Sequence, residues 1–376
     1  MRTKSQDLTH LFGFLIAVVF VTIATHLNAR PLNPVVKTQK EQQSIFDFIS
    51  HSDIIEMTLT TDLQRLLKDN RNSDYQEATL SFEDSEGNTI VSKIKVRQRG
   101  KYRRRICDFP PLKLDFSKKA LKKAGLNPQF DDMKLVTHCL DTKSASKETV
   151  LKEFLAYQLY NEISEDSYRV QLIKITYIDS QSNKKIKNRY GFLIEDVDEL
   201  AARMNGEECE MMNLPQEELN ANSENTVAVF QYMIGNEDWN ISMLRNVKLI
   251  KNTNSQKAKV VPYDFDFSGF VDAPYAIPNP DVKLVSVKDR AFLGRRVGEE
   301  SMKRTLAIFQ NKEEVLINKV KNFKYLKKST RKELVRYLAS FYDILEKHHY
   351  KEVEMRWTNA APVFEESFTS PKPLLN

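Results

Sequence analysis

Residues 262–269 read Pro-Tyr-Asp-Phe-Asp-Phe-Ser-Gly, and residues 234–240, which precede them, read Ile-Gly-Asn-Glu-Asp-Trp-Asn. Between them the chain alternates in the manner of two short strands, over 246–250 and 259–263. Polar side chains therefore stand at the places where these strands begin and end. An aspartate in a loop, an asparagine at the start of the next strand and a pair of aspartates after the following strand form an ordered set that one strand pair can bring together.

The rest of the chain predicts regular elements on both sides of this set. A β-rich first half contains one embedded helix, over 146–163, whose apolar positions recur at helical spacing. A mostly helical second half follows, with an apolar segment over 226–234 and amphipathic helix over 299–357. The strands expected in the first half lie at 77–82, 90–96, 111–116, 169–178 and 190–194.

The ordered polar set matches what phosphoryl transfer requires. Such a reaction needs a carboxylate that orients the attacking hydroxyl, an Asn and an Asp that hold Mg²⁺, and a Lys fixed by a Glu. Asp238, Asn246 and the Asp264/Asp266 pair supply the first three parts in that order. Lys113 on a predicted strand and Glu153 on the long predicted helix supply the fourth.

These motifs resemble those of the kinase-like family of spore coat protein H, with the similarity running from about residue 90 to residue 269. The resemblance implies an α+β, atypical two-lobed protein-kinase-like fold, with a β-rich N-lobe and a mostly helical C-lobe. It implies a catalytic loop with Asp238 and Asn246, and a metal set made of Asn246, Asp264 and Asp266. The nucleotide-binding residues that it implies are Arg97, Arg99, Gly100, Lys113 and Glu153.

The function expected from these residues is an exported kinase. It would transfer the γ-phosphoryl group of ATP to a hydroxyl, most readily on a protein, with Mg²⁺ or Mn²⁺. Two alternatives stay open. One is a catalytically weak pseudokinase that acts as a cell-envelope binding module, favoured by Arg245 in the place of an expected histidine. The other is transfer of AMP on the same scaffold.

The N-terminus predicts the compartment. Arg2 and Lys4 precede an uncharged stretch over 11–24, and Ala29 offers a cleavage position. We therefore expect a signal peptide over 1–29, with an uncleaved anchor as the alternative and the only contact with a membrane, and a periplasmic or cell-envelope location. A polar linker over 30–45, an N-lobe over 46–195 and a C-lobe over 196–376 complete the expected organisation.

Composition excludes several other classes of protein. Apolar residues form 41% of the 376 residues and charged residues 29%, which is typical of a folded chain. The net charge of +6 is spread among interspersed acids and bases, so no nucleic-acid partner is expected. The three cysteines allow at most one disulfide, and buried free thiols are the expected state.

Overall fold

A computed structural model describes residues 42–68, 74–255 and 257–347. The predicted signal peptide, nearly all of the predicted linker and the last part of the predicted C-terminal helix lie outside these residues. Within the described ranges, no helix combines the length and the apolar character needed to cross a bilayer.

Seven strands in the first half of the described chain form a closed barrel. Neighbouring strands are antiparallel, apart from the first and sixth, which run parallel and close the sheet. In the order in which they lie around the barrel, the strands are β1 (Ile55–Thr61), β2 (Gln76–Glu83), β3 (Thr89–Gln98), β4 (Leu112–Phe116), β5 (Asp132–Val136), β7 (Lys185–Ile194) and β6 (Val170–Asp179). The strands expected from alternation are therefore confirmed, and β1 and β5 are additional.

The barrel corrects the expected fold class. A two-lobed kinase-like fold is wrong for this chain, although the chain is a mixture of helices and strands. The physical reason lies in β1, which pairs with β2 on one edge and with β6 on the other, so no open edge remains between the first and sixth strands. Closing the sheet satisfies the backbone groups that an open sheet would expose at its edges.

Alternating side chains explain why the strands curl around a core. In β1, Ile55, Met57 and Leu59 are buried, whereas the residues between them are half-buried or exposed. The period of two places one apolar row inside the barrel. Leu80 of β2 and Val96 of β3 face the same interior and are fully buried.

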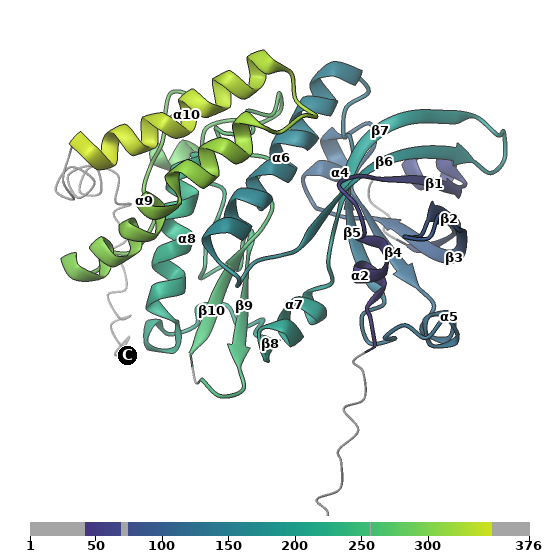
Figure 1. Ribbon diagram of the computed structural model, residues 1–376, viewed down its shortest axis with the longest axis horizontal. Helices are drawn as coiled ribbons and strands as arrows, with labels where there is room; N and C mark the ends of the chain where they lie inside the picture. The colour runs from purple at the N-terminus through teal and green to yellow at the C-terminus, as the bar shows by residue number, and fades with distance from the viewer. Residues whose placement is uncertain (1–41, 69–73, 256, 348–376) are drawn as a thin grey trace, which may run out of the picture. The chain divides into compact units, whose positions relative to one another are not determined.

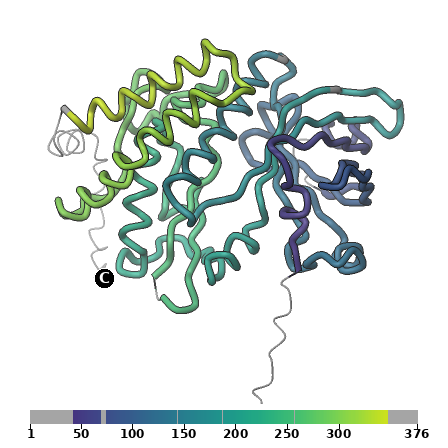
Figure 2. The backbone as a smooth tube through the Cα atoms, in the orientation of Figure 1, coloured from purple at the N-terminus to yellow at the C-terminus, as the bar shows by residue number. Residues whose placement is uncertain are grey.

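The second half of the described chain holds a three-stranded antiparallel sheet and the helices α8, α9 and α10 (Figure 1). The sheet has the order β10 (Ala258–Pro262), β9 (Val247–Asn252) and β8 (Gly206–Glu208). Helix α8 (Ala221–Ile234) packs on β10, and α9 (Glu299–Lys321) packs on α8 and on α10 (Lys328–Lys347). Figure 2 follows the chain from the blue barrel strands through the green sheet to these two yellow-green helices.

Helix α6 (Lys143–Ile163) joins the two halves. It follows β5 and packs against β6 and β7 on one side and against α9 on the other. Its residues Leu151, Phe154 and Leu155 are buried. The shorter helices are α2 (Ile45–Ile49), α3 (Leu63–Lys68), α4 (Arg103–Ile106), α5 (Lys118–Lys123) and α7 (Val197–Arg203), with single 3₁₀ turns at Gln216–Glu218 and Pro280–Val282.

Two apolar cores meet at strands β5 and β7. Leu135 and Leu193 belong to the barrel core, whereas their chain neighbours Val136 and Phe192 belong to the core of the helical half. Because successive side chains of a strand point to opposite faces, these strands form the wall between the cores. A side chain on an element that packs against these strands is therefore held in position by both cores.

A disulfide corrects the expectation of free thiols. Cys107 and Cys139 are bonded, and Cys209 is the free cysteine. Sequence spacing could not select this pair, because the turn after α4 and the turn after β5 meet only in the folded chain. Phe109 donates its backbone N–H to the carbonyl of Cys139 at 2.9 Å, which holds the two turns side by side.

Candidate functional site

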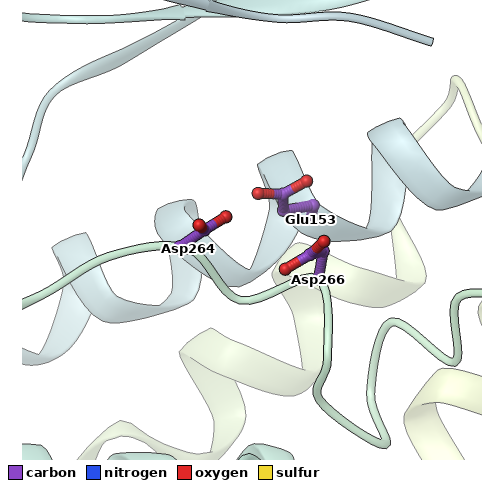
Figure 3. A group of neighbouring side chains, drawn as sticks. All are labelled: Glu153, Asp264 and Asp266. Carbon is purple, nitrogen blue, oxygen red and sulfur yellow. The ribbon is translucent and has the colours of Figure 1, made fainter. Parts of the chain in front are cut away.

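Three carboxylates converge between α6 and the loop that follows β10 (Figure 3). Glu153 comes from α6, and Asp264 and Asp266 come from the loop. One oxygen from each lies within 4.8 Å of the others. Glu153 and Asp266 are buried and Asp264 is half-buried, so Asp264 is the member of the cluster that solvent reaches most.

Local backbone geometry points both aspartates into this cluster. Asp264 has a φ of 65°, a left-handed conformation that turns the chain sharply after β10. Its backbone N–H donates to the hydroxyl of Tyr157 at 2.8 Å, and Tyr275 donates its hydroxyl to Asp266 at 3.0 Å. Phe265, between the two aspartates, is fully buried in the helical core. The loop is therefore fixed by packing and by hydrogen bonds before any ligand arrives.

Arg103 is the counter-ion of the cluster. Its guanidinium donates to both oxygens of Glu153 at 3.2 Å, forms an ion pair with Asp264, and lies 3.2 Å from Asp266. Burial alone would lower the pKa of Arg103, but the carboxylates of Asp266 and Glu153 outweigh it and hold that pKa above its usual value. Burial raises the pKa of Glu153 to about 7, against the opposing charge of Arg103.

Asp238 and Asn246 lie together at the same end of the β8–β10 sheet. The side-chain amide of Asn246 donates to the carbonyl of Asp238 at 2.7 Å and to its carboxylate at 2.9 Å. The carbonyl of Asn246 accepts from the N–H of Tyr263, one residue before Asp264. The expected neighbourhood of Asp238, Asn246 and the two later aspartates is therefore present.

Arg245 contributes a charge beside Asp238. Its Nε lies 3.4 Å from the Asp238 carboxylate, and both side chains remain partly exposed. Burial raises the pKa of Asp238, and Arg245 partly offsets that effect. A carboxylate with a raised pKa is a stronger base than an ordinary aspartate, which is the property that a proton acceptor needs.

Lys113 and Glu153 are not partners in the structure. Lys113 pairs with Asp132 across the β4–β5 ladder at 2.5 Å, and Glu153 pairs with Arg103. Arg97 lies over the ring of Tyr75, 5.0 Å from its centroid, and Gly100 turns the chain after β3 with a φ of 81°. Of the residues expected to bind a nucleotide, Glu153 is itself a member of the carboxylate cluster, and Arg99 lies close enough to Glu153 for their charges to interact.

Lys134 is the residue that sequence reasoning missed. It lies directly opposite Lys113 in the β4–β5 register, and its ammonium lies 4.8 Å and 5.1 Å from the ring centroids of Tyr168 and Tyr263. Burial, followed by the charge of Arg99, lowers its pKa to about 7. A lone lysine inside the apolar run Met-Lys-Leu-Val was the available signal.

Arg99 and Lys134 are neighbouring cations, here called the cationic edge, and Arg99 also lies close enough to Glu153 for their charges to interact. Burial lowers the pKa of Arg99, with the charge of Arg103 next, while the nearby carboxylate of Glu153 raises it. Two half-buried cations that repel each other are stabilised when an anion binds between them. Arg99 therefore connects the carboxylate cluster with a second cation, Lys134.

No protein-family model matches the chain, and no curated protein is significantly similar to it. The resemblance to the family of spore coat protein H thus stays a prediction.

Proposed function

We propose that this protein transfers a phosphoryl group from ATP to a hydroxyl group, with Mg²⁺ or Mn²⁺ as its metal. The observation that carries the proposal is the convergence of Glu153, Asp264 and Asp266 next to the Asp238–Asn246 pair. Acidic oxygens for a metal, a separate proton acceptor and cations for phosphates are the parts that phosphoryl transfer needs. The proposal uses this arrangement of residues and makes no use of a kinase-like fold.

The donor set fits a hard divalent cation. Carboxylate and amide oxygens are the ligands that Mg²⁺ and Mn²⁺ prefer, and no sulfur or imidazole takes part. Asp264 and Asp266 would hold the metal, with Glu153 and the amide oxygen of Asn246 as further oxygen ligands. Such a metal supplies positive charge that neutralises phosphate oxygens.

Asp238 is the proton acceptor in this proposal. The oxygen of the acceptor hydroxyl bonds to the γ-phosphorus of ATP, the bond from that phosphorus to the β–γ bridging oxygen breaks, and ADP leaves with the electron pair. The hydroxyl proton passes to the carboxylate of Asp238, which Asn246 holds in place through two hydrogen bonds.

Arg99 and Lys134 would bind the phosphates of the nucleotide. The ammonium of Lys134 lies against the rings of Tyr168 and Tyr263, and it forms no ion pair with a carboxylate of the described residues. A triphosphate would raise the pKa of Lys134 by stabilising its charged form. Gly100, which precedes α4, leaves the backbone free to turn close to this cationic edge.

A second candidate function is nucleotide binding without turnover, as in a cell-envelope binding module. The contact between Arg245 and Asp238 favours it, because a paired carboxylate accepts a proton less readily.

The acceptor that we propose for the enzyme is a protein. The disulfide between Cys107 and Cys139 supports an exported protein, since disulfides persist in oxidising compartments.

The test measures the melting temperature of the full chain with ATP, with and without Mn²⁺, for the wild type and for Asp264→Asn. A ligand that binds only the folded state stabilises it by about 2.7 kcal/mol at a hundredfold excess over its dissociation constant. We expect a metal-dependent increase in the wild type and none in the variant. Absence of any increase with nucleotide in the wild type would contradict the proposal.

Mass spectrometry of the incubated protein separates the two functions. A gain of about 80 Da on an acceptor is expected for phosphoryl transfer, whereas a gain of about 329 Da would mean transfer of AMP. Asp238→Asn should retain the nucleotide-dependent stabilisation and lose the mass gain. Binding with no mass gain in the wild type would favour the binding module.

A further inference from the structure

Arg103 is carried by an element that cannot hold its own position. Helix α4 is a single turn, and its N-cap residue Tyr102 makes no capping hydrogen bond. Isolated helices of one turn do not persist in water. The C-cap of α4 is Cys107, which donates its N–H to the carbonyl of Arg103 at 2.9 Å and forms the disulfide with Cys139. The disulfide therefore fixes the end of the turn that carries Arg103.

The second cysteine of this disulfide lies in the segment between β5 and α6, the helix that carries Glu153. Cys139 ends the segment after β5 and has a φ of 54°, and α6, which carries Glu153, begins four residues later. Thr137 donates its hydroxyl to the carbonyl of Phe109 at 2.6 Å, which strengthens this junction. One covalent link thus joins the chain that bears Arg103 to the chain that leads to Glu153.

Arg103 uses the oxygens that a metal would use. Its side chain is 7% exposed, and the described contacts of its guanidinium go to Glu153, Asp264 and Asp266. A guanidinium and a divalent cation are alternative counter-ions for the same carboxylates, and each lowers the benefit of the other by repulsion. The cluster can be neutralised by either one, but not favourably by both in the same place.

We propose that Arg103 is an internal counter-ion that a divalent cation displaces from the three carboxylates, and that the Cys107–Cys139 disulfide sets how readily it leaves. The inference rests on the proposed function in one respect, namely that a divalent cation binds these carboxylates. It adds a competing residue and a covalent tether that the function itself does not require.

Opposite effects on stability and on metal binding follow. Without the guanidinium, three carboxylates are left close together, so the metal-free protein loses stability. The metal then binds without displacing a charge, so its affinity rises. Without the disulfide, α4 is released at one end and Arg103 leaves more easily, so metal affinity rises by a smaller factor.

The experiment uses the full chain and Mn²⁺ alone as the probe. Melting temperature in a chelator and Mn²⁺ affinity by calorimetry are measured for the wild type, Arg103→Met, Arg103→Gln and Cys107→Ser/Cys139→Ser. Arg203→Met is the matched control, because Arg203 also pairs with a buried carboxylate, that of Glu195. Cys209→Ser is the control for loss of a thiol.

We expect Arg103→Met to melt earlier in chelator and to bind Mn²⁺ on the order of tenfold more tightly than the wild type. The double serine variant should bind Mn²⁺ with an affinity between those two. Arg203→Met should melt earlier with unchanged Mn²⁺ affinity, and Cys209→Ser should match the wild type. If Arg103→Met does not fold, Arg103→Gln and the double serine variant carry the test.

Equal or weaker Mn²⁺ binding after loss of the guanidinium would overturn the inference and leave the proposed function standing. Wild-type affinity in the double serine variant would overturn the role of the disulfide. Absence of Mn²⁺ binding in every variant would overturn both the inference and the metal requirement of the proposed function.

Discussion

Two lysines on neighbouring strands, Lys113 and Lys134, have different surroundings because their nearest side chains differ. Lys113 and Lys134 face each other across the β4–β5 ladder, yet Lys113 has Asp132 as its partner and Lys134 has two tyrosine rings. Sequence reasoning selected Lys113 because it lies on a predicted strand, over 111–116, whereas β5, which carries Lys134, was not predicted. The choice between the two lysines as the proposed phosphate-binding residue therefore depends on the folded chain.

Lys134→Met should stabilise the protein at pH 7 and below and remove nucleotide-dependent stabilisation. The pKa of Lys134 is about 7 when folded and near 10.5 in an unfolded chain, so the unfolded state binds more protons between these values. Wild-type stability therefore rises with pH across that window, and the advantage of the variant should shrink there. Lys113→Met is the control and should destabilise instead, since it leaves Asp132 unpaired; the same result for both variants would contradict this assignment.

The buried carboxyl group of Glu237 should give the stability of the protein a second dependence on pH. Its carboxyl is buried, one of its oxygens has no hydrogen-bond partner, and burial raises its pKa to about 8. The folded state keeps the proton that the unfolded state releases above about pH 4.5, so stability falls as pH rises from there to about 8. In thermal melts, the melting temperature of Glu237→Gln relative to the wild type should therefore increase with pH across this window. Above the window the difference should stay constant. Glu210→Gln, at an exposed position, should show no such trend.

At the scale of an element, the end of α8 positions the loop that carries Asp238. Gly235 is the C-cap of α8 in a left-handed conformation, with a φ of 62°. A Cβ at this position would lie 2.2 Å from the hydroxyl of Tyr337. Both the backbone conformation and the close approach therefore require glycine at the start of the loop that carries Asp238.

Gly235→Ala should lower stability by about 1–3 kcal/mol, through the strained φ and the clash. Tyr337→Phe removes the clashing oxygen, so the double variant should recover part of that loss but not the part due to φ. Chemical denaturation of the two single variants and the double variant measures the coupling. Strictly additive losses would show that Tyr337 is not the limiting contact.

The helices and strands were largely predictable from the sequence. The partners of the polar side chains at their ends were predictable only in part. Alternation located β2, β3 and β9, and helical spacing located α6, because these patterns are local. The partner of Glu153 is Arg103, fifty residues earlier on a one-turn helix with no periodicity of its own. Long-range ion pairs and the disulfide depend on which turns meet in space, and no local pattern records this.

At the scale of the whole described molecule, closure of the barrel is the main difference from the expected fold. The expectation of a two-lobed fold rested on the order of elements, and that order is compatible with both an open sheet and a closed one. The parallel pairing of β1 with β6 distinguishes them, and it joins strands that lie far apart in the sequence. Pairing between distant strands leaves little trace in either strand alone.

Hydrogen exchange checks the closure directly. In a closed barrel both edges of β1 are paired, so the amides of Met57 to Thr61 should be protected as well as those of β2. Leu59→Ala, at a fully buried position of the barrel core, should lower stability by about 2–5 kcal/mol. Fast exchange throughout β1, as at the edge of an open sheet, would contradict the closed topology.

The direction of the barrel strands has a practical consequence. Strand β3 ends beside Arg99, and β7 ends at Ile194 where it packs against α6, so the turns at 84–88 and 180–184 lie at the opposite ends of those strands. Ten residues of extended chain span roughly 33 Å. Reporter domains or epitopes inserted at these two turns should therefore leave the carboxylates undisturbed. The turns at 84–88 and 180–184 are thus positions where the chain can accept inserted sequence without a change in the arrangement of Glu153, Asp264 and Asp266.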